Sequence, residues 1–246
     1  MGLMQERRGL SGNALKLIAC FFMVVDHVGL ILLPQYIILR VLGRLAFPVF
    51  AFMIAEGARH TRSRLRYFLT VFISAVTVQE VLYIFEHSLE MSIFFTFSLS
   101  LPLIYALDFV KRTIIGGRSG TKMAFSLLAF ILAVAAAFCI CEVLDVDYGF
   151  LGVMTPVITS LFMMPKDAPD EYKRFDELPM HVLTCGIALL LLSGMGKGIQ
   201  AYSLLALPLL LSYSGERGRL RLKYFFYLFY PLHLALLWGI SLLISR

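Results

Sequence analysis

Charged residues are scarce in this sequence. Asp, Glu, Lys and Arg together make up 15% of the 246 residues, whereas hydrophobic residues make up 59%. Soluble domains carry about a quarter charged residues, so this composition excludes an ordinary soluble protein and indicates an integral membrane protein. Because a membrane-spanning helix needs roughly 20 apolar residues, the chain has room for about eight to ten spans joined by short loops.

Several motifs of enzymes and metal sites are also absent. The sequence contains no HExxH motif, no GxSxG nucleophile turn and no Walker motif. Its four cysteines, which lie in apolar runs without CxxC spacing, are Cys20, Cys139, Cys141 and Cys185. We therefore expect free buried thiols and no bound metal. The first apolar run lacks a small-residue cleavage site, so we expect a permanent span rather than a signal peptide.

Nine apolar segments follow one another along the chain. Lipid offers the backbone no hydrogen-bond partner, so each segment is predicted to be helical. The predicted spans are 13–33, 36–58, 66–86, 92–109, 123–143, 148–164, 178–196, 199–213 and 224–244. This pattern predicts an all-α polytopic membrane protein in which residues 1–246 form a single helical bundle.

The basic residues predict an orientation, because Lys and Arg are enriched in cytoplasmic loops. Eighteen of the 22 basic residues fall in alternate connections. They are Arg7, Arg8 and Lys16; Arg59, Arg62, Arg64 and Arg66; Lys111, Arg112, Arg118 and Lys122; Lys166, Lys173 and Arg174; and Arg217, Arg219, Arg221 and Lys223. This alternation predicts nine spans with the N-terminus in the cytoplasm. The net charge of +6 then reflects loops beside anionic headgroups and requires no nucleic acid; a cytoplasmic anionic ligand such as a nucleotide phosphate is the alternative.

Ionisable residues also lie inside the predicted spans, where they need partners and mark candidate functional sites. At a rise of about 1.5 Å per residue, Asp26 and Glu80 lie roughly 20 Å from the inner face, and Arg44 lies roughly 18 Å from it. His27 belongs to the same depth. These residues predict a polar cavity in the outer half of the bundle. The alternative is a salt bridge that only locks the helices together.

Other polar residues lie along the remaining spans. Glu56 and Arg59 are spaced to pair along one helix face near the inner end of the second span. His233 in the last span is either a packed histidine or part of a cavity wall. Asp147 and Tyr148 stand where the sixth span begins and fit the usual interfacial residues.

Four stretches of the sequence resemble the TraX family of membrane proteins. They are LKLIACFFMVVDHVG (15–29), RLAFPVFAFMIAEGARHTRSRLRYF (44–68), DYGFLGV (147–153) and YFFYLFYPLHL (224–234). The family is associated with conjugative plasmids, where it implies N-acetylation of the pilin amino terminus. It also looks similar to the acyltransferase-3 type of transmembrane enzymes, which pass acetyl from cytoplasmic acetyl-CoA to an acceptor at the outer side. The resemblance implies a multi-pass protein of the bacterial inner membrane.

The resemblance also implies catalytic roles for particular residues. The related acyltransferases use an essential histidine in an early span, and the matching residue here is His27, which suits a general base near neutral pH. Asp26 or Glu80 would orient the imidazole and stabilise its charged form. Arg44 would stabilise the oxyanion or hold an anionic part of the acceptor.

The remaining candidates would bind the two substrates. Arg59, Arg62 and Arg64, with Glu56 beside them, would meet the phosphates of acetyl-CoA at the inner face. The segment 46–52, AFPVFAF, resembles the phenylalanine–proline stretch that lines the reaction tunnel of the related enzymes. The acceptor, a pilin-like N-terminus or a glycan of the envelope, would enter past the residues Tyr148, Asp147 and His233.

Two other classes of protein remain open from the sequence. Asp, Glu, His and Arg at one depth are also what a proton-coupled transporter needs, although we find no inverted repeat in the sequence. The polar layer could equally serve only as a helix lock in a non-catalytic membrane assembly factor.

Overall fold

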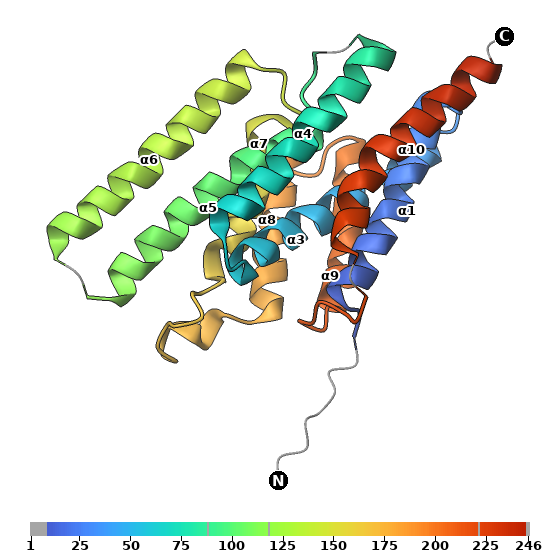
Figure 1. Ribbon diagram of the computed structural model, residues 1–246. Helices are drawn as coiled ribbons and strands as arrows, with labels where there is room; N and C mark the ends of the chain where they lie inside the picture. Colours follow the sequence, from blue (N-terminus) through green and yellow to red (C-terminus); the bar gives the residue numbers. More distant parts are fainter. Residues whose placement is uncertain (1–8, 88, 118, 221, 245–246) are drawn as a thin grey trace.

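The structure is a computed structural model that describes residues 9–87, 89–117, 119–220 and 222–244, and every named element in these ranges is helical. The elements are α1 (Gly12–Ile31), α2 (Ile37–Gly43), α3 (Ala46–His60), α4 (Arg64–Glu86), α5 (Ile93–Ile115), α6 (Gly120–Val143), α7 (Gly149–Thr159), the 3₁₀ helices η1 (Ser160–Phe162) and η2 (Tyr172–Phe175), α8 (Leu178–Leu192), the 3₁₀ helix η3 (Ile199–Ala206), α9 (Leu207–Leu211) and α10 (Lys223–Ile244). Figure 1 shows α5 and α6 as an antiparallel pair and α1 beside α10, with α3 between the two groups. The all-α prediction is confirmed for the described residues.

Six helical stretches have the length and hydropathy of a membrane span. They are Gly12–Ile31, Ile37–His60, Arg64–Phe85, Ile93–Ile115, Gly120–Val143 and Tyr224–Ile244. Three shorter apolar stretches, Gly149–Phe162, Leu178–Leu192 and Ile199–Leu211, occupy the positions of the sixth, seventh and eighth predicted spans. A helix of 15 residues covers only about 23 Å of a hydrocarbon core about 30 Å thick. A multi-pass membrane protein is thus supported, and the count of nine spans stays a prediction.

The second predicted span is interrupted, which corrects the expectation of one continuous helix over 36–58. α2 ends at Gly43, and Arg44 and Leu45 form a turn before α3 begins at Ala46. Pro48 explains the break, because it has no amide hydrogen to donate to the Arg44 carbonyl four residues earlier and its ring crowds that carbonyl. The chain therefore turns at Arg44, the arginine that was predicted to lie within the membrane.

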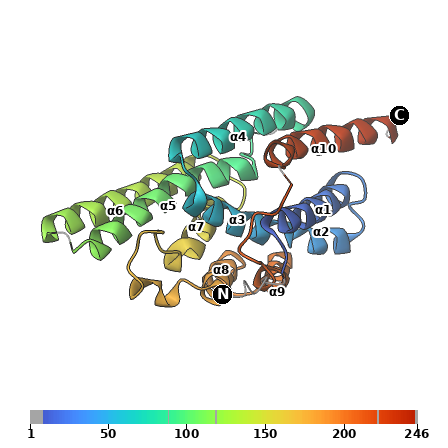
Figure 2. The same ribbon diagram turned by 60° about the horizontal axis from the view of Figure 1, so that its bottom comes forward.

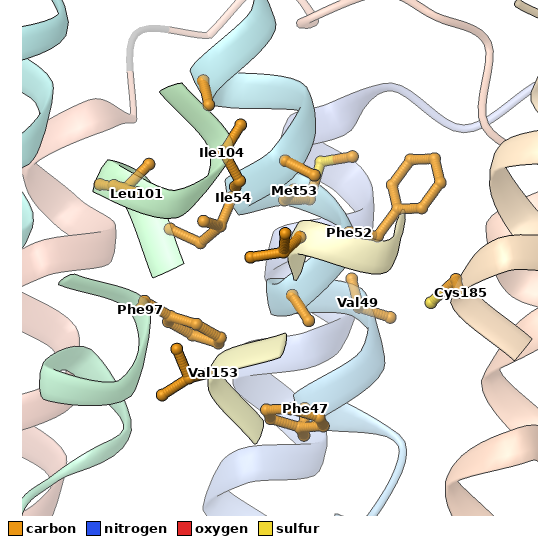
Figure 3. Close-up of a cluster of buried hydrophobic side chains, with 14 of the residues drawn as sticks. Phe47, Val49, Phe52, Met53, Ile54, Phe97, Leu101, Ile104, Val153 and Cys185 are labelled. Atoms are coloured by element: carbon orange, nitrogen blue, oxygen red, sulfur yellow. The ribbon is translucent and has the colours of Figure 1, made fainter. Parts of the chain in front are cut away.

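The core of the protein is built around α3. Ten of its fifteen residues are buried, and it contacts α1, α5, α7, α8 and η3. Figure 2 shows α3 in the middle of the molecule, between α5 and α7 on one side and α1 on the other. In the close-up of Figure 3, Phe52 and Ile54 of α3 lie with Leu101 of α5, Val153 of α7 and Cys185 of α8. Residues 46–55 of α3 are all apolar, as expected for a helix at such a central position.

α6 lies at the edge of the molecule. Only Ser126 and Ala137 of its 24 residues are buried, and Ser126 Oγ lies 2.8 Å from Thr113 Oγ1 of α5 in a hydrogen bond between the two helices. Hydroxyl hydrogen bonds of this kind hold transmembrane helices together where lipid provides no hydrophobic driving force. The exposed apolar side chains of α6 accordingly fit a surface that faces lipid.

The described parts of the five connections predicted to be cytoplasmic lie at the same end of the bundle (Figure 1). Hydrogen bonds join the start of α1 to Glu216, the end of α5 to Asp167, and the end of α3 to Asp176. At the opposite end, the amide of Met91 donates to the Asp145 carbonyl at 2.6 Å. Basic residues of the orientation argument that lie outside the described residues are Arg7, Arg8, Arg118 and Arg221. The basic connections thus lie together at one end of the bundle, as their alternation along the sequence predicted. The cytoplasmic location of the N-terminus stays a prediction.

The close approach of α1 and α2 at Gly29 makes a testable prediction. A Cβ added at Gly29 would lie 2.7 Å from the Cβ of Leu39, an atom fixed to the backbone of α2. Gly29→Ala should therefore separate the two helices and lower the free energy of unfolding by about 1–3 kcal/mol. Thermal unfolding of the purified protein in detergent measures this loss.

Gly239 of α10 provides the matched control, because a Cβ added there meets no atom within 4 Å. Gly239→Ala should leave the unfolding temperature unchanged or slightly raised, since alanine favours a helix over glycine. Equal unfolding temperatures for the two variants would contradict the packing of α1 against α2.

Candidate functional site

A cavity of about 300 Å³, here called the Asp26 pocket, lies at the end of the bundle opposite the basic connections. Its wall is formed by α1, the α2–α3 break, α4, the segments before α5 and α7, and α10. The charged and polar side chains that line it are Asp26, His27, Arg40, Arg44, Glu90, Ser92, Asp147, Tyr148 and Tyr230. The structure thus brings Asp26, His27, Arg44, Asp147 and Tyr148 of the predicted site together.

Asp26 is 9% exposed and is held by two arginines. Arg44 Nη2 donates to Asp26 Oδ1 at 2.7 Å and to Oδ2 at 3.0 Å, and Arg40 Nη1 also donates to the carboxylate. Gly43 makes room for this group, because a Cβ there would lie 2.1 Å from Asp26 Oδ1. A buried carboxylate is tolerated when it is paired and hydrogen-bonded in this way, which explains how the first helix accommodates Asp26.

Arg44 connects this ion pair to the far side of the pocket. Its Nη1 lies 3.1 Å from the hydroxyl of Tyr148 and 3.4 Å from Oε1 of Gln200. Tyr148 has a φ of 61°, which is uncommon for a residue with a side chain, and its ring stacks on Phe47 with centroids 4.3 Å apart. A strained backbone that persists is held by its surroundings, and here Arg44 and Phe47 provide the contacts.

The two candidate histidines form a pair across α1 and α10. His27 lines the pocket, and its Nδ1 lies 3.0 Å from Nε2 of His233. His233 itself is 7% exposed and stands behind His27, outside the pocket lining. Among the two alternatives from the sequence, His233 is thus a packed histidine and not part of the wall of this pocket.

Glu80 also departs from its predicted position. Its side chain is exposed on α4, and it does not line the Asp26 pocket. Leu82, two residues further along α4, does line the pocket, but depth alone does not say which way a helix face points. Glu90 and Asp147 are the carboxylates that line the pocket with Asp26.

Asp147 lies in the connection before α7, outside the helices. Burial, reinforced by the nearby carboxylate of Glu90, raises the pKa of Asp147 to about 7. The guanidinium of Arg44 acts in the opposite direction but does not cancel this effect. The carboxyl of Asp147 therefore changes charge near neutral pH.

A second cavity of about 310 Å³, here called the Arg59 pocket, lies at the end where the basic connections meet. The basic side chains that line it are Arg59, Arg62, Arg64, Lys111, Arg112 and Lys166, and Asp108 is the one carboxylate in this described lining. Arg64 and Arg112 both donate to Asp108. The pocket retains an excess of positive charge, as an anionic ligand requires.

Arg59 is fixed at the edge of this pocket by the connection before α8. Its Nη2 donates to Asp176 Oδ2 at 2.5 Å, and His181 Nε2 lies 3.0 Å from the other carboxylate oxygen. Burial would raise the pKa of Asp176, but the contacts with His181 and Arg59 outweigh it and leave that pKa below its ordinary value. Arg59 Nε is buried without a hydrogen-bond partner among the described residues.

Glu56 does not belong to this pocket, which corrects its predicted place beside the arginines. It accepts a hydrogen bond from the hydroxyl of Tyr213 at 3.2 Å and lies 3.5 Å from His60 Nδ1. The predicted pair of Glu56 and Arg59 along one helix face is also absent from their contacts, because Asp176 takes Arg59 instead. No pattern in the sequence indicated that Asp176, from a distant segment, would pair with Arg59 in place of Glu56.

Several site residues were missed from the sequence. Arg40 was not singled out, although its spacing of four residues from Arg44 places both on one helix face. Lys111, Arg112 and Lys166 were counted only as cytoplasmic charges. The place of Glu90 in the pocket could not be predicted from the residues around it. Hydrogen bonds between Met91 and residues 145 and 147 bring its segment to the pocket.

The fold and these pockets define a class: a polytopic helical membrane protein with a charged pocket at each end of its bundle. The chain belongs to the TraX family, because the family model described as TraX protein matches residues 11–241. The predicted resemblance to TraX is therefore confirmed. The wider relation to acyltransferase-3 enzymes stays a prediction.

Two relatives extend this comparison. A protein of Dichelobacter nodosus, named probable fimbrial assembly protein FimC of serogroup H1, is 26% identical over 244 residues, which cover 95% of this chain and 97% of that protein. A Rickettsia prowazekii (strain Madrid E) protein, named uncharacterized protein RP591, is 48% identical over 40 residues, or 16% of each chain. No solved structure matches.

The raised pKa of Asp147 predicts a pH-dependent stability. The pKa in the folded protein, about 7, exceeds the ordinary value of about 3.9, so the unfolded chain ionises first. The stability linked to Asp147 is therefore full below about pH 4 and is lost as pH rises through about 7. Asp147→Asn removes this loss, and its unfolding temperature should exceed that of the parent by about 3–6 °C at pH 8.

The control compares the unfolding temperatures of Asp147→Asn and the parent at pH 5, where the ionisation of Asp147 lowers the stability of the folded protein less. The gain from Asp147→Asn should shrink to less than about half. A gain of equal size at both pH values, or a loss at both, would show that the ionisation of Asp147 is not responsible.

Proposed function

We propose that the protein is a membrane-embedded acetyltransferase that moves an acetyl group from acetyl-CoA, bound at the Arg59 pocket, to an amine or hydroxyl group at the Asp26 pocket. One observation carries the proposal: a basic pocket and a pocket that contains an imidazole lie at opposite ends of the bundle and share the wall of α3. In this proposal the chain crosses a bacterial inner membrane nine times, with the N-terminus and the Arg59 pocket in the cytoplasm.

The Arg59 pocket suits the phosphates of an acyl-CoA. Arg62 and Lys166 are exposed at its edge, and Arg59 Nε has no acceptor among the described residues. Arginine recognises phosphate through paired hydrogen bonds as well as charge. Phe50 at one pocket and Arg59 at the other are nine residues apart on α3, about 14 Å along the helix, which a pantetheine arm of about 20 Å can cover.

The Asp26 pocket supplies the groups that acyl transfer requires. As the acceptor nitrogen or oxygen attacks the thioester carbonyl, its proton passes to His27. Arg44 is placed to stabilise the oxyanion. When the carbon–sulfur bond breaks, the CoA thiolate leaves and takes the proton from His27. The contacts of Asp26 go to Arg40 and Arg44, so in this scheme Asp26 positions the arginines rather than the imidazole.

His27→Ala should lower acetyl transfer by at least about 10²-fold, because the variant lacks the base. The assay incubates purified protein in liposomes with radiolabelled acetyl-CoA and envelope membranes from a strain that lacks the gene, and mass spectrometry locates the acetylated acceptor. His87→Asn is the control: His87 ends α4 at a φ of 51°, which asparagine tolerates, and its transfer should match the parent. Full transfer by His27→Ala would remove the histidine from the mechanism.

Arg62→Ala should weaken CoA binding by about five- to tenfold, the effect of losing one charged phosphate contact. Isothermal titration of CoA into the protein in detergent measures the affinity. Arg66→Ala is the matched control, since Arg66 is exposed close by on α4 and does not line the pocket. If both variants bind CoA as the parent does, the Arg59 pocket is not the donor site.

The name of the Dichelobacter nodosus relative supports a second candidate, a role in fimbrial assembly without catalysis. The two candidates differ in what the polar residues must do. An assembly factor needs the Asp26 pairing only as a helix lock, so His27→Ala would still restore assembly in a deletion strain. A proton-coupled transporter predicts that CoA does not bind.

A further inference from the structure

The histidine pair has a single consistent hydrogen-bonding arrangement. His27 Nδ1 lies 2.8 Å from the Met23 carbonyl oxygen, and His233 Nδ1 lies 2.9 Å from the Phe229 carbonyl oxygen. Carbonyl oxygens only accept hydrogen bonds, so each neutral ring carries its proton on Nδ1. His233 Nε2 then carries a lone pair, and the one Nδ1–H of His27 is shared between two acceptors, the Met23 carbonyl at 2.8 Å and His233 Nε2 at 3.0 Å. The opposite tautomers would set lone pairs against both carbonyl oxygens.

Aromatic neighbours fix the two rings in this orientation. The ring of His233 stacks on Phe229 with centroids 5.1 Å apart and planes inclined by 14°. Tyr230 meets His27 edge-on at 5.7 Å and His233 edge-on at 5.3 Å. The hydrogen-bonded edge of His27 therefore faces α10 and its own helix, which leaves Nε2 as the lone-pair nitrogen of a ring that lines the Asp26 pocket.

We propose that His233 is a positioning residue that holds His27 in the Nδ1–H tautomer and thereby presents Nε2 of His27 as the proton acceptor. The chemical part of this proposal rests on the proposed function. In the transfer, the acceptor proton moves to His27 Nε2 and later to the CoA thiolate, while His27 Nδ1–H stays hydrogen-bonded to His233. His233 neither gains nor loses a proton.

This arrangement differs from the usual pairing of a catalytic histidine with a carboxylate. Asp26 directly precedes His27 in the chain, but its carboxylate already binds Arg40 and Arg44. A neutral imidazole can fix the tautomer without adding a negative charge near those arginines. The pair thus separates two tasks: Asp26 holds the guanidinium groups, and His233 holds the base.

Nitrogen-15 NMR of histidine-labelled protein tests the tautomer directly and needs no substrate. The chain has five histidines, and the signals of His27 are assigned by their loss in His27→Gln. In the parent protein we expect the proton of His27 on Nδ1. In His233→Leu the Met23 carbonyl is the one acceptor left for the Nδ1 proton, so we expect the Nε2–H tautomer to become detectable beside the Nδ1–H form. His233→Gln should keep the Nδ1–H form alone, because its amide oxygen can accept at the place of Nε2.

Kinetics give the second readout. His233→Leu should lower kcat for acetyl transfer by about tenfold or more while leaving KM for acetyl-CoA unchanged, and His233→Gln should restore most of kcat. Should the leucine variant not fold, His233→Phe replaces it, since a phenyl ring keeps the stacking on Phe229. An Nε2–H tautomer of His27 in the parent, or a tautomer unaffected by leucine or phenylalanine, would overturn the proposal even if acetyl transfer is established. Absence of transfer with an intact tautomer effect would instead reject the proposed function.

Discussion

The pairing of one buried carboxylate with two arginines is the constraint on which the rest of the site depends. An unpaired charge among apolar helices costs several kcal/mol, so Asp26 requires Arg40 and Arg44 in the folded state. The pairing draws α2 against α1, where Gly29 and Gly43 allow close approach. Pro48 breaks the helix at Arg44, so that the guanidinium reaches both Asp26 and Tyr148. The pocket is thus a consequence of satisfying one charge.

The break also decides the course of α3, and α3 relates the two pockets. After the turn at Arg44 the chain enters the middle of the molecule, where most of α3 is buried against five other elements (Figure 3). One end of the helix lines the Asp26 pocket with Ala46 and Phe47. The other end lines the Arg59 pocket with Ala58 and Arg59. A rigid helix between two sites keeps their separation fixed, which transfer over a defined distance requires.

Local patterns in the sequence predicted most of this, and distant contacts account for what they missed. Apolar runs predicted the position of every α-helix among the described residues, and depth along a helix placed Asp26, His27 and Arg44 at one level, where all three line one pocket. Depth could not show that Glu80 faces outward, because the rotation of α4 follows from its packing on α5 and α10. Nor could it show that His233 meets His27 or that Asp176 takes Arg59, since these pairs join segments far apart in the chain.

The layer between the two pockets bears on which function the fold suits. Ile54 lies between Phe50 and Ala58 on the same face of α3. Its side chain is 9% exposed and belongs to one buried cluster with Leu101 and Ile104. A proton-coupled carrier needs a chain of polar groups along its path, and these three side chains offer none. In the proposed acyl transfer, a pantetheine arm would have to displace these side chains to reach the Asp26 pocket, where the same layer would keep water from the reacting thioester. Both candidate functions therefore require this layer to open, and proton transport would in addition require polar groups that these three side chains do not supply.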